Sequence, residues 1–258
     1  MALGPPNWAL DISKGFEDRW PLESLYLQSM AHSNMGNQQA ALQAIKRGVE
    51  LGLPIERVLA GPRNLFEDLY EYEEFQTYLA DFDVKLIHGP ALANVTSSSA
   101  GFWVRTAGEN NVHVEYSTNT DMSDSQLSEN FTTSKTDDYT TVAHAHGLSA
   151  DTTYYYNLFV DGTQINTKPY NFTTYPSEDN TSDFLVAFGG GAGYTPEHEY
   201  MWNTISNYDL SAFLALGDNV YIDTPKVPET QKYCYYRRQS RPEYRALTHR
   251  VPFYSIWD

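Results

Sequence analysis

The segment Gly217–Tyr221, which reads Gly-Asp-Asn-Val-Tyr, directly follows an apolar run at Phe213–Leu216. Its Asp218 and Tyr221 offer hard oxygen ligands of the kind that bind metal ions. Because a free tyrosine has a pKa of about 10, only a strongly Lewis-acidic metal such as ferric iron would hold Tyr221 ionised at neutral pH. The alternative interpretation is structural, with Asp218 capping a turn and Tyr221 packed in a core.

Two short apolar runs, at Phe184–Phe188 and Phe213–Leu216, are typical of buried strands and would position these residues. Between them, residues 195–197 (Thr-Pro-Glu) predict the start of a helix, with a capping residue, a proline and an acid in its first turn. A strand, a helix and a second strand in this order predict two parallel strands. Ligands of such sheets bind beyond the carboxyl ends of the strands, which is where the pattern places Asp218.

The first of these strand patterns ends in three glycines, Gly189–Gly191, which have no side chains to bind a metal ion. Their backbone N–H groups would be open, and the N-terminus of the following helix favours an anion. Gly190, Gly191 and His198 are therefore candidates for binding a phosphate group. The glycines fit a tight turn equally well, which is the structural alternative.

The order of three motifs resembles the PhoD-type alkaline phosphatases, which are dinuclear metallophosphoesterases. These motifs are Gly217–Tyr221, the tyrosine- and arginine-rich segment 233–245, and the ending Val251–Asp258, which reads Val-Pro-Phe-Tyr-Ser-Ile-Trp-Asp. Purple acid phosphatases share the Gly-Asp-x-x-Tyr element. The resemblance covers residues 85–258 and says little about the part before them.

This resemblance implies a pair of metal ions, calcium and ferric iron. It places Asp218 as the ligand that bridges both ions and makes Tyr221 and Asp258 further ligands. Such a pair activates a water molecule and stabilises charge on the phosphoryl oxygens of a small phosphate ester. Family members are usually exported, although residues 1–20 show no secretory signal.

Two departures from the family pattern affect the site. The family has a metal-binding cysteine where this chain has Gly190 or Gly191. Either a nearby group such as His198 or Glu197 substitutes for it, or the first metal ion is weakly bound or absent. The later, histidine-rich ligands of the family would follow Asp258. A parallel sheet that stops at its third strand also leaves an open edge, which predicts that this chain is the front part of a longer protein.

Residues 1–83 are predicted to be a helical region that is irregular up to residue 20. Helices at 22–36 and 38–51 resemble one tetratricopeptide-like hairpin, interpreted as packing on the rest of the chain because no second copy follows. A single amphipathic helix is predicted over Leu65–Phe82. Its acidic face is interpreted as solvated, the alternative being a docking surface for a basic partner.

Short alternating runs separated by turn residues predict a β-sandwich over residues 84–176. Residues 148–154 resemble the tyrosine-corner segment of fibronectin type III domains, with Tyr154 as the corner. His144 and His146 alternate on one strand and are interpreted as surface or packing residues rather than a metal pair. The predicted strands are Val84–His88, Gly101–Arg105, Val112–Tyr116, Thr140–Ala145, Tyr154–Val160 and Tyr170–Thr174.

After residue 223, helices are predicted at Glu229–Arg238 and Pro242–Arg250, followed by a third strand at Val251–Trp257. These helices carry four arginines that could reach a phosphate or pair with acids on the helix surface. The arginines are Arg237, Arg238, Arg241 and Arg245.

The formal net charge of −16 argues against a nucleic-acid partner, because polyanions bind through Lys and Arg. It also means that an anionic phosphate substrate needs local positive charge, which metal ions would supply. No apolar run approaches the ~20 residues needed to span a bilayer.

Together these patterns predict a multi-domain α+β protein. Its parts are a helical region (1–83), a fibronectin III-like β-sandwich (84–176) and the truncated start of an α/β metallophosphoesterase sandwich (181–258). The predicted function is hydrolysis of phosphate esters by a metal-activated water in the full-length protein, this chain alone being an inactive fragment. The alternative is a non-catalytic binding protein with a degenerate phosphoesterase domain.

Overall fold

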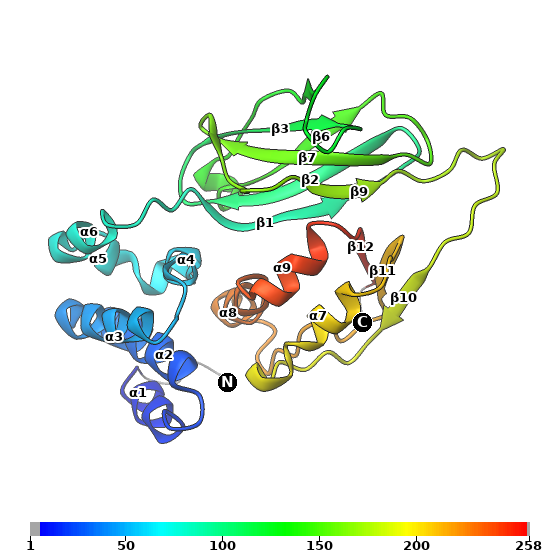
Figure 1. Cartoon of the computed structure of the whole chain (residues 1–258). Helices are drawn as coiled ribbons and strands as arrows, with labels where there is room; N and C mark the ends of the chain where they lie inside the picture. Colours follow the sequence, from blue (N-terminus) through cyan, green and yellow to red (C-terminus); the bar gives the residue numbers. More distant parts are fainter. Residues whose placement is uncertain (1–5, 257–258) are drawn as a thin grey trace. The chain divides into compact units, whose positions relative to one another are not determined.

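The computed structural model describes residues 6–256 of the 258-residue chain. The chain divides into two compact units, one of Met1–Val84 with Tyr221–Ser240 and one of Lys85–Val220 with Arg241–Asp258. Helices dominate the first unit and strands the second, so the chain is a mixed α+β protein, as predicted (Figure 1). Within residues 6–256, no helix is both long and apolar enough to cross a membrane.

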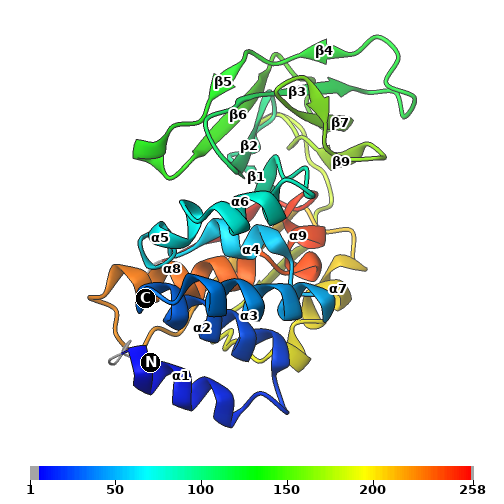
Figure 2. The same ribbon diagram turned by 90° about the vertical axis from the view of Figure 1, so that its left-hand side faces the viewer.

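The unit of residues 1–84 and 221–240 is helical (Figure 2). The predicted helices over 22–36 and 38–51 are confirmed as α2 and α3, which pack side by side. The segments are α1 (Pro6–Gly15), α2 (Pro21–Asn34), α3 (Gln38–Glu50), α4 (Ile55–Ala60), η1 (Arg63–Leu65), α5 (Glu67–Tyr70), α6 (Glu73–Leu79) and α8 (Pro228–Gln239).

The expectation of an irregular start is wrong for residues 6–15, which form α1. This helix packs against α2, where the Ser24 hydroxyl donates to the Ser13 carbonyl at 2.8 Å. Ser13 and Ser24 are both fully buried. Tertiary packing therefore stabilises a helix that has no strong signal of its own.

The predicted single helix over Leu65–Phe82 is also wrong, because the chain forms α5 and α6 separated at Tyr72. Tyr72 is extended, with φ −77° and ψ 121°. A continuous helix would place Glu71 beside Glu74 at the i, i+3 spacing, where like charges repel. Breaking the helix still buries the apolar side chains of both parts, since Leu69 and Phe75 are fully buried.

The unit of residues 85–220 and 241–258 contains a β-sandwich. One sheet has the order β1-β2-β6, and the other joins β4, β3, β7 and β8, with β5 on β3 and β9 on β7. The six predicted strands are confirmed as β1, β2, β3, β6, β7 and β9, whereas β4, β5 and β8 are two-residue strands that the pattern does not show. The strands are β1 (Leu86–Ala93), β2 (Ser99–Thr106), β3 (Asn111–Ser117), β4 (Gln126–Leu127), β5 (Phe131–Thr132), β6 (Thr140–His146), β7 (Thr153–Val160), β8 (Thr163–Gln164) and β9 (Tyr170–Thr173).

Both sheets contribute to one apolar core, centred on Phe102 of β2, Tyr156 of β7 and Phe172 of β9. The tyrosine corner is confirmed, because the Ser149 N–H donates to the Tyr154 hydroxyl at 2.9 Å. This bond fixes the connection from β6 to β7.

The two histidines of β6 are packing and surface residues, as interpreted from the sequence. The His144 and His146 rings stack with their centroids 5.7 Å apart, and the His144 ring also meets Phe131 edge-on at 5.9 Å. His146 is exposed. The contacts of the pair are thus with each other and with an aromatic ring.

The same unit contains a three-stranded sheet of β10 (Val186–Gly189), β11 (Ala212–Ala215) and β12 (Phe253–Ser255). All neighbouring pairs are parallel, as predicted for the first two strands. Two helices, α7 (Met201–Ser206) and α9 (Pro242–Thr248), pack on one face of the sheet. Their core includes Trp202, Phe213 and Leu247.

Within this unit the β-sandwich also contacts the α9–β12 segment. The Tyr156 hydroxyl donates to the His249 carbonyl at 2.6 Å, and the Tyr170 ring stacks on His249 at 4.1 Å. Arg245 donates from Nη2 to the Gly89 carbonyl at 2.9 Å. The sandwich and the parallel sheet are therefore held together by polar and aromatic contacts.

Candidate functional site

The carboxyl ends of the three parallel strands meet at one edge of the sheet. The Gly217–Asn219 loop follows β11 at this edge, and residues 190–191 follow β10. The Asn219 side chain donates from Nδ2 to the Ile256 carbonyl just past β12, at 3.2 Å. This is the edge at which parallel sheets bind their ligands, so the predicted placement of Asp218 is confirmed.

Backbone hydrogen bonds join the first two loops. The Gly191 N–H donates to the Gly217 carbonyl at 3.3 Å, and the Ala192 N–H donates to the Asp218 carbonyl at 3.1 Å. A Cβ at Gly190 would lie 3.2 Å from the Gly217 oxygen, so a larger residue would crowd the other loop. The glycines therefore serve the close approach of two loops, in line with the structural alternative.

These bonds correct part of the predicted phosphate site. The sequence predicts an open Gly191 N–H, but this group is used by the Gly217 carbonyl. Gly190 lies exposed in the same loop, and His198 is exposed at the end of η3 (Pro196–His198). The phosphate-binding prediction consequently rests on Gly190 and His198.

The helix start predicted at residues 195–197 is a short 3-10 turn. Pro196 occupies its first position, but Thr195 makes no side-chain capping bond. The α-helix begins later, at Met201. Just before it, the Glu199 carboxylate accepts a hydrogen bond from the Trp202 indole N–H at 2.9 Å. The helix N-terminus that was expected to favour an anion is therefore only a single 3-10 turn.

Asp218 adopts a left-handed backbone conformation with φ +47° and is exposed. Aspartate is one of the few residues with a side chain that tolerate this conformation. The preceding Gly217, at φ +104°, needs the freedom of glycine. Two consecutive residues with positive φ turn the chain sharply at the end of β11 and leave the Asp218 residue at the surface.

The two other predicted metal ligands, Tyr221 and Asp258, remain predictions. Tyr221 is 52% exposed, so the alternative that it is a core residue is wrong. It belongs to the unit of residues 1–84 and 221–240, whereas Asp218 belongs to the other unit. Asp258 lies outside the described residues.

Residues 6–256 contain no group of three or more His, Cys, Asp or Glu side chains placed to hold a metal ion. Calcium takes six to eight oxygen ligands, and a second ion needs its own set. Asp218 alone does not meet this requirement, and the glycine loop adds no side-chain ligand. The described residues therefore do not fit a complete two-metal centre, and no catalytic step through a metal follows from them.

The four arginines suggested for phosphate binding have other contacts. Arg241 pairs with Glu243 at 2.8 Å, as the surface-pairing interpretation predicts. Arg245 binds the Gly89 carbonyl, Arg238 is buried, and Arg237 lies over the Tyr233 ring at 5.0 Å.

A polar cluster around a buried ion pair in the helical unit has no counterpart among the predicted sites. Glu23, Arg57 and Tyr233 meet there although Glu23 lies 34 residues from Arg57 and 210 from Tyr233. Charged residues in an amphipathic helix are normally solvated, and no motif links such distant positions. Only the fold brings them together.

Comparison with known proteins adds three observations. Residues 83–178, which cover the β-sandwich, match a family described as a domain of unknown function, DUF7800. No curated protein of similar sequence was found. A solved structure, "Structure of PhoD", is similar with a TM-score of 0.58 and 15% sequence identity, over 65% of this chain and 38% of that chain.

The likeness to PhoD shows a shared fold, and the chain spans 38% of the length of that protein. Two further structures resemble the chain more weakly. A sensor domain of the anti-sigma factor RsgI4 of Pseudobacteroides cellulosolvens has a TM-score of 0.29 and 16% identity, over 37% of this chain and 97% of that chain. The FN1-FN3 domains of chicken CNTN1 have a TM-score of 0.24 and 13% identity, over 33% of this chain and 30% of that chain.

Proposed function

We propose that the full-length protein hydrolyses phosphate esters, as a metallophosphoesterase of PhoD type. One observation carries the proposal: within a PhoD-like fold, an exposed aspartate stands just beyond the central strand of a parallel sheet, at its carboxyl end. The sharp Gly217–Asp218 turn and the hydrogen bonds to the glycine loop hold that position. Chemistry in such sheets is built at this edge.

Calcium and ferric iron are the proposed cofactors, with Asp218, Tyr221 and Asp258 as candidate ligands. When bound, such a pair supplies an activated water and stabilises charge on the phosphoryl group. The remaining ligands are proposed to come from outside residues 6–256, because those residues lack a complete ligand set. The role of Asp218 in this chain is to place a carboxylate at the edge of the sheet.

The substitution Asp218→Asn tests this role in the full-length protein. Asparagine has nearly the same shape and also tolerates the left-handed conformation, so the fold should be unchanged. Asp179→Asn, in an exposed turn, is the matched control because it removes the same charge elsewhere. Aryl phosphate mono- and diesters are supplied together with calcium and ferric iron.

We expect metal-dependent turnover by the wild type and the Asp179 variant, and a loss of at least about 100-fold in the Asp218 variant. Equal turnover of all three proteins would contradict the assignment of Asp218. A folded wild type without turnover on any of these esters would instead favour the non-catalytic binding protein.

A further inference from the structure

The chain segment directly after the Gly217–Tyr221 motif belongs to the N-terminal helical unit. Residues 221–240 group with residues 1–84, although 136 residues of the other unit, Lys85–Val220, lie between them in the sequence. The segment consists of a loop and then α8 (Pro228–Gln239). The contacts that hold α8 therefore also determine the position of the loop that begins at Tyr221.

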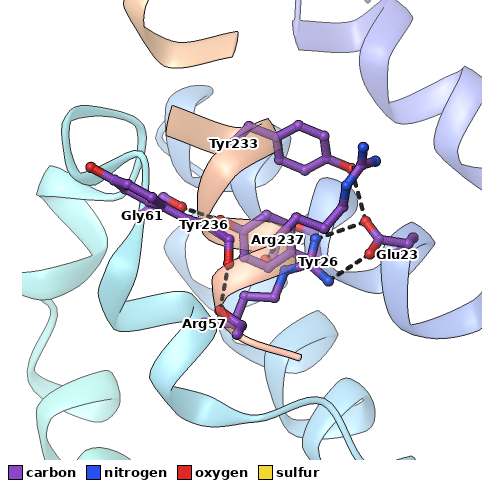
Figure 3. Close-up of polar contacts among 9 residues, drawn as sticks. Glu23, Tyr26, Arg57, Gly61, Tyr233, Tyr236 and Arg237 are labelled. Carbon is purple, nitrogen blue, oxygen red and sulfur yellow. Dashed lines mark hydrogen bonds and ion pairs between the residues drawn. The ribbon is translucent and has the colours of Figure 1, made fainter. Parts of the chain in front are cut away.

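A buried ion pair joins α2 and α4 of this unit (Figure 3). Arg57 of α4 donates from Nη1 and Nη2 to the two carboxylate oxygens of Glu23 in α2, at 2.7 Å each. The two residues are 6% and 7% exposed. Burial alone would raise the pKa of Glu23, but Arg57 and the other groups around the carboxylate lower it to about 2. The carboxylate is consequently ionised throughout the physiological range.

Tyr233 connects α8 to this ion pair. Its hydroxyl donates to Glu23 Oε2 at 2.8 Å, and its ring stacks on Tyr26 with centroids 6.0 Å apart. Arg57 lies over the Tyr26 ring at 4.2 Å, and Arg237 lies over the Tyr233 ring at 5.0 Å (Figure 3). A hydrogen bond to a buried carboxylate is stronger and more directional than one between neutral groups.

Further hydrogen bonds extend from α8 back toward Tyr221. The Thr224 hydroxyl donates to the Thr230 hydroxyl at 3.1 Å, and the Gln231 amide donates to the Pro225 carbonyl. At the start of the helix, Asn64 donates from Nδ2 to Glu229 at 2.9 Å. A continuous path of contacts thus leads from the ion pair to a loop residue three positions after Tyr221.

We propose that residues 1–84 position the segment after the Gly217–Tyr221 motif, with Glu23, Arg57 and Tyr233 as positioning residues. The helical region then holds in place the segment that contains Tyr221. The importance of this for catalysis rests on the proposed function, in which Tyr221 is a metal ligand. The positioning itself does not depend on any activity.

The first test measures hydrogen exchange by mass spectrometry on the full chain. Tyr233→Phe removes the hydroxyl that donates to Glu23 and that also accepts a hydrogen bond from Arg237 at 3.4 Å. Tyr235→Phe, on an exposed residue of the same helix, is the matched control. Losing a hydrogen bond to a buried charge should speed exchange in residues 221–240 roughly tenfold. Exchange in residues 85–220 should stay unchanged, and Tyr235→Phe should have no effect.

Glu23→Gln is a second variant that keeps the shape of the side chain while removing its charge. It should speed exchange in residues 221–240 as well, because the Tyr233 hydroxyl loses its ionised acceptor. Unchanged exchange in these residues for both Tyr233→Phe and Glu23→Gln would overturn the proposal.

The second test is kinetic and uses aryl phosphate hydrolysis by the full-length protein. A positioning role predicts that Tyr233→Phe lowers kcat several-fold and leaves KM within about twofold, because the group acts on geometry and not on substrate binding. Faster exchange with unchanged kcat would overturn the catalytic part. Faster exchange in a protein whose wild type has no turnover would support the positioning and reject the proposed function.

Discussion

At the scale of single residues, Asp218 has an unusual backbone conformation and is also the proposed metal ligand. Its φ of +47° is unfavourable for most residues with a Cβ, and its carbonyl accepts the hydrogen bond from Ala192. A sequence shows that an aspartate follows a glycine, but it does not show that the backbone turns left-handed there. Position 218 therefore has two separate requirements, a residue that tolerates the left-handed backbone and a carboxylate for the proposed function.

Asp218→Gly and Asp218→Ala make this separation measurable. Alanine in the left-handed conformation should lower the free energy of unfolding by about 1 kcal/mol relative to glycine. Urea unfolding monitored by circular dichroism compares the two variants. Both variants should lack turnover, because neither has a carboxylate. Equal stability of the two would show that the turn relaxes without cost.

His249 gives the unit of residues 85–220 and 241–258 a predicted dependence on pH. Burial lowers the pKa of His249 to about 4, below its ordinary value of 6.5, and the charges of Arg250 and Arg245 act in the same direction. The folded state therefore binds fewer protons than the unfolded state between these pH values. Its stability falls as the pH drops from 6.5 toward 4.

Unfolding in urea at pH 7 and at pH 5 tests this dependence. His249→Gln removes the titrating group, so the loss of stability between the two pH values should be smaller than in the wild type by about 1–2 kcal/mol. His146→Gln is the control because His146 is exposed. The same loss of stability in the wild type and the His249 variant would contradict the assignment.

At the scale of elements, the tyrosine corner is a prediction that the structure confirms in detail. Tyr154→Phe removes the hydroxyl that accepts the Ser149 N–H and should cost about 1 kcal/mol of stability. Tyr155→Phe, on the neighbouring residue of β7, serves as the control. Thermal unfolding followed by circular dichroism measures both. A Tyr154 variant as stable as the control would show that the corner bond adds nothing.

The elements that could be predicted from sequence are those whose signals are local. Alternating residues indicate the sandwich strands, and two apolar runs around a helix start indicate the parallel pair β10 and β11. The break at Tyr72 was not predictable because the apolar spacing from Leu65 to Phe82 continues across it. The spacing of apolar residues indicates which side chains will be buried. Whether one helix or two helices bury them depends on charge repulsion and tertiary packing.

In the candidate site, too, local features could be predicted from sequence and long-range contacts could not. The position of Asp218 follows from a strand and the residue after it, which are adjacent in sequence. The use of the Gly191 N–H by the Gly217 carbonyl depends on two loops more than 20 residues apart. The Glu23–Arg57–Tyr233 cluster spans still longer distances, so the sequence without the fold carries no signal for it.

At the scale of the whole molecule, residues 1–84 are predicted to need residues 221–240 for full stability, because both segments form one unit. A fragment of residues 1–84 should gain several degrees in Tm when a peptide of residues 221–240 is added, since about 1 kcal/mol shifts the Tm of a domain this size by 4–8 °C. A peptide with Tyr233→Ala should give a smaller shift. No shift with the unmodified peptide would mean that the two segments are independent.

The measurement that tests the proposed function most directly is the metal content of the full-length protein. After loading with calcium and ferric iron and removal of free ions, elemental analysis counts the metal bound per chain. A metallophosphoesterase in which Asp218 bridges two ions predicts about two bound ions in the wild type and the loss of at least one in Asp218→Asn. A folded wild type that retains no metal, or an Asp218 variant that retains as much as the wild type, would contradict this function.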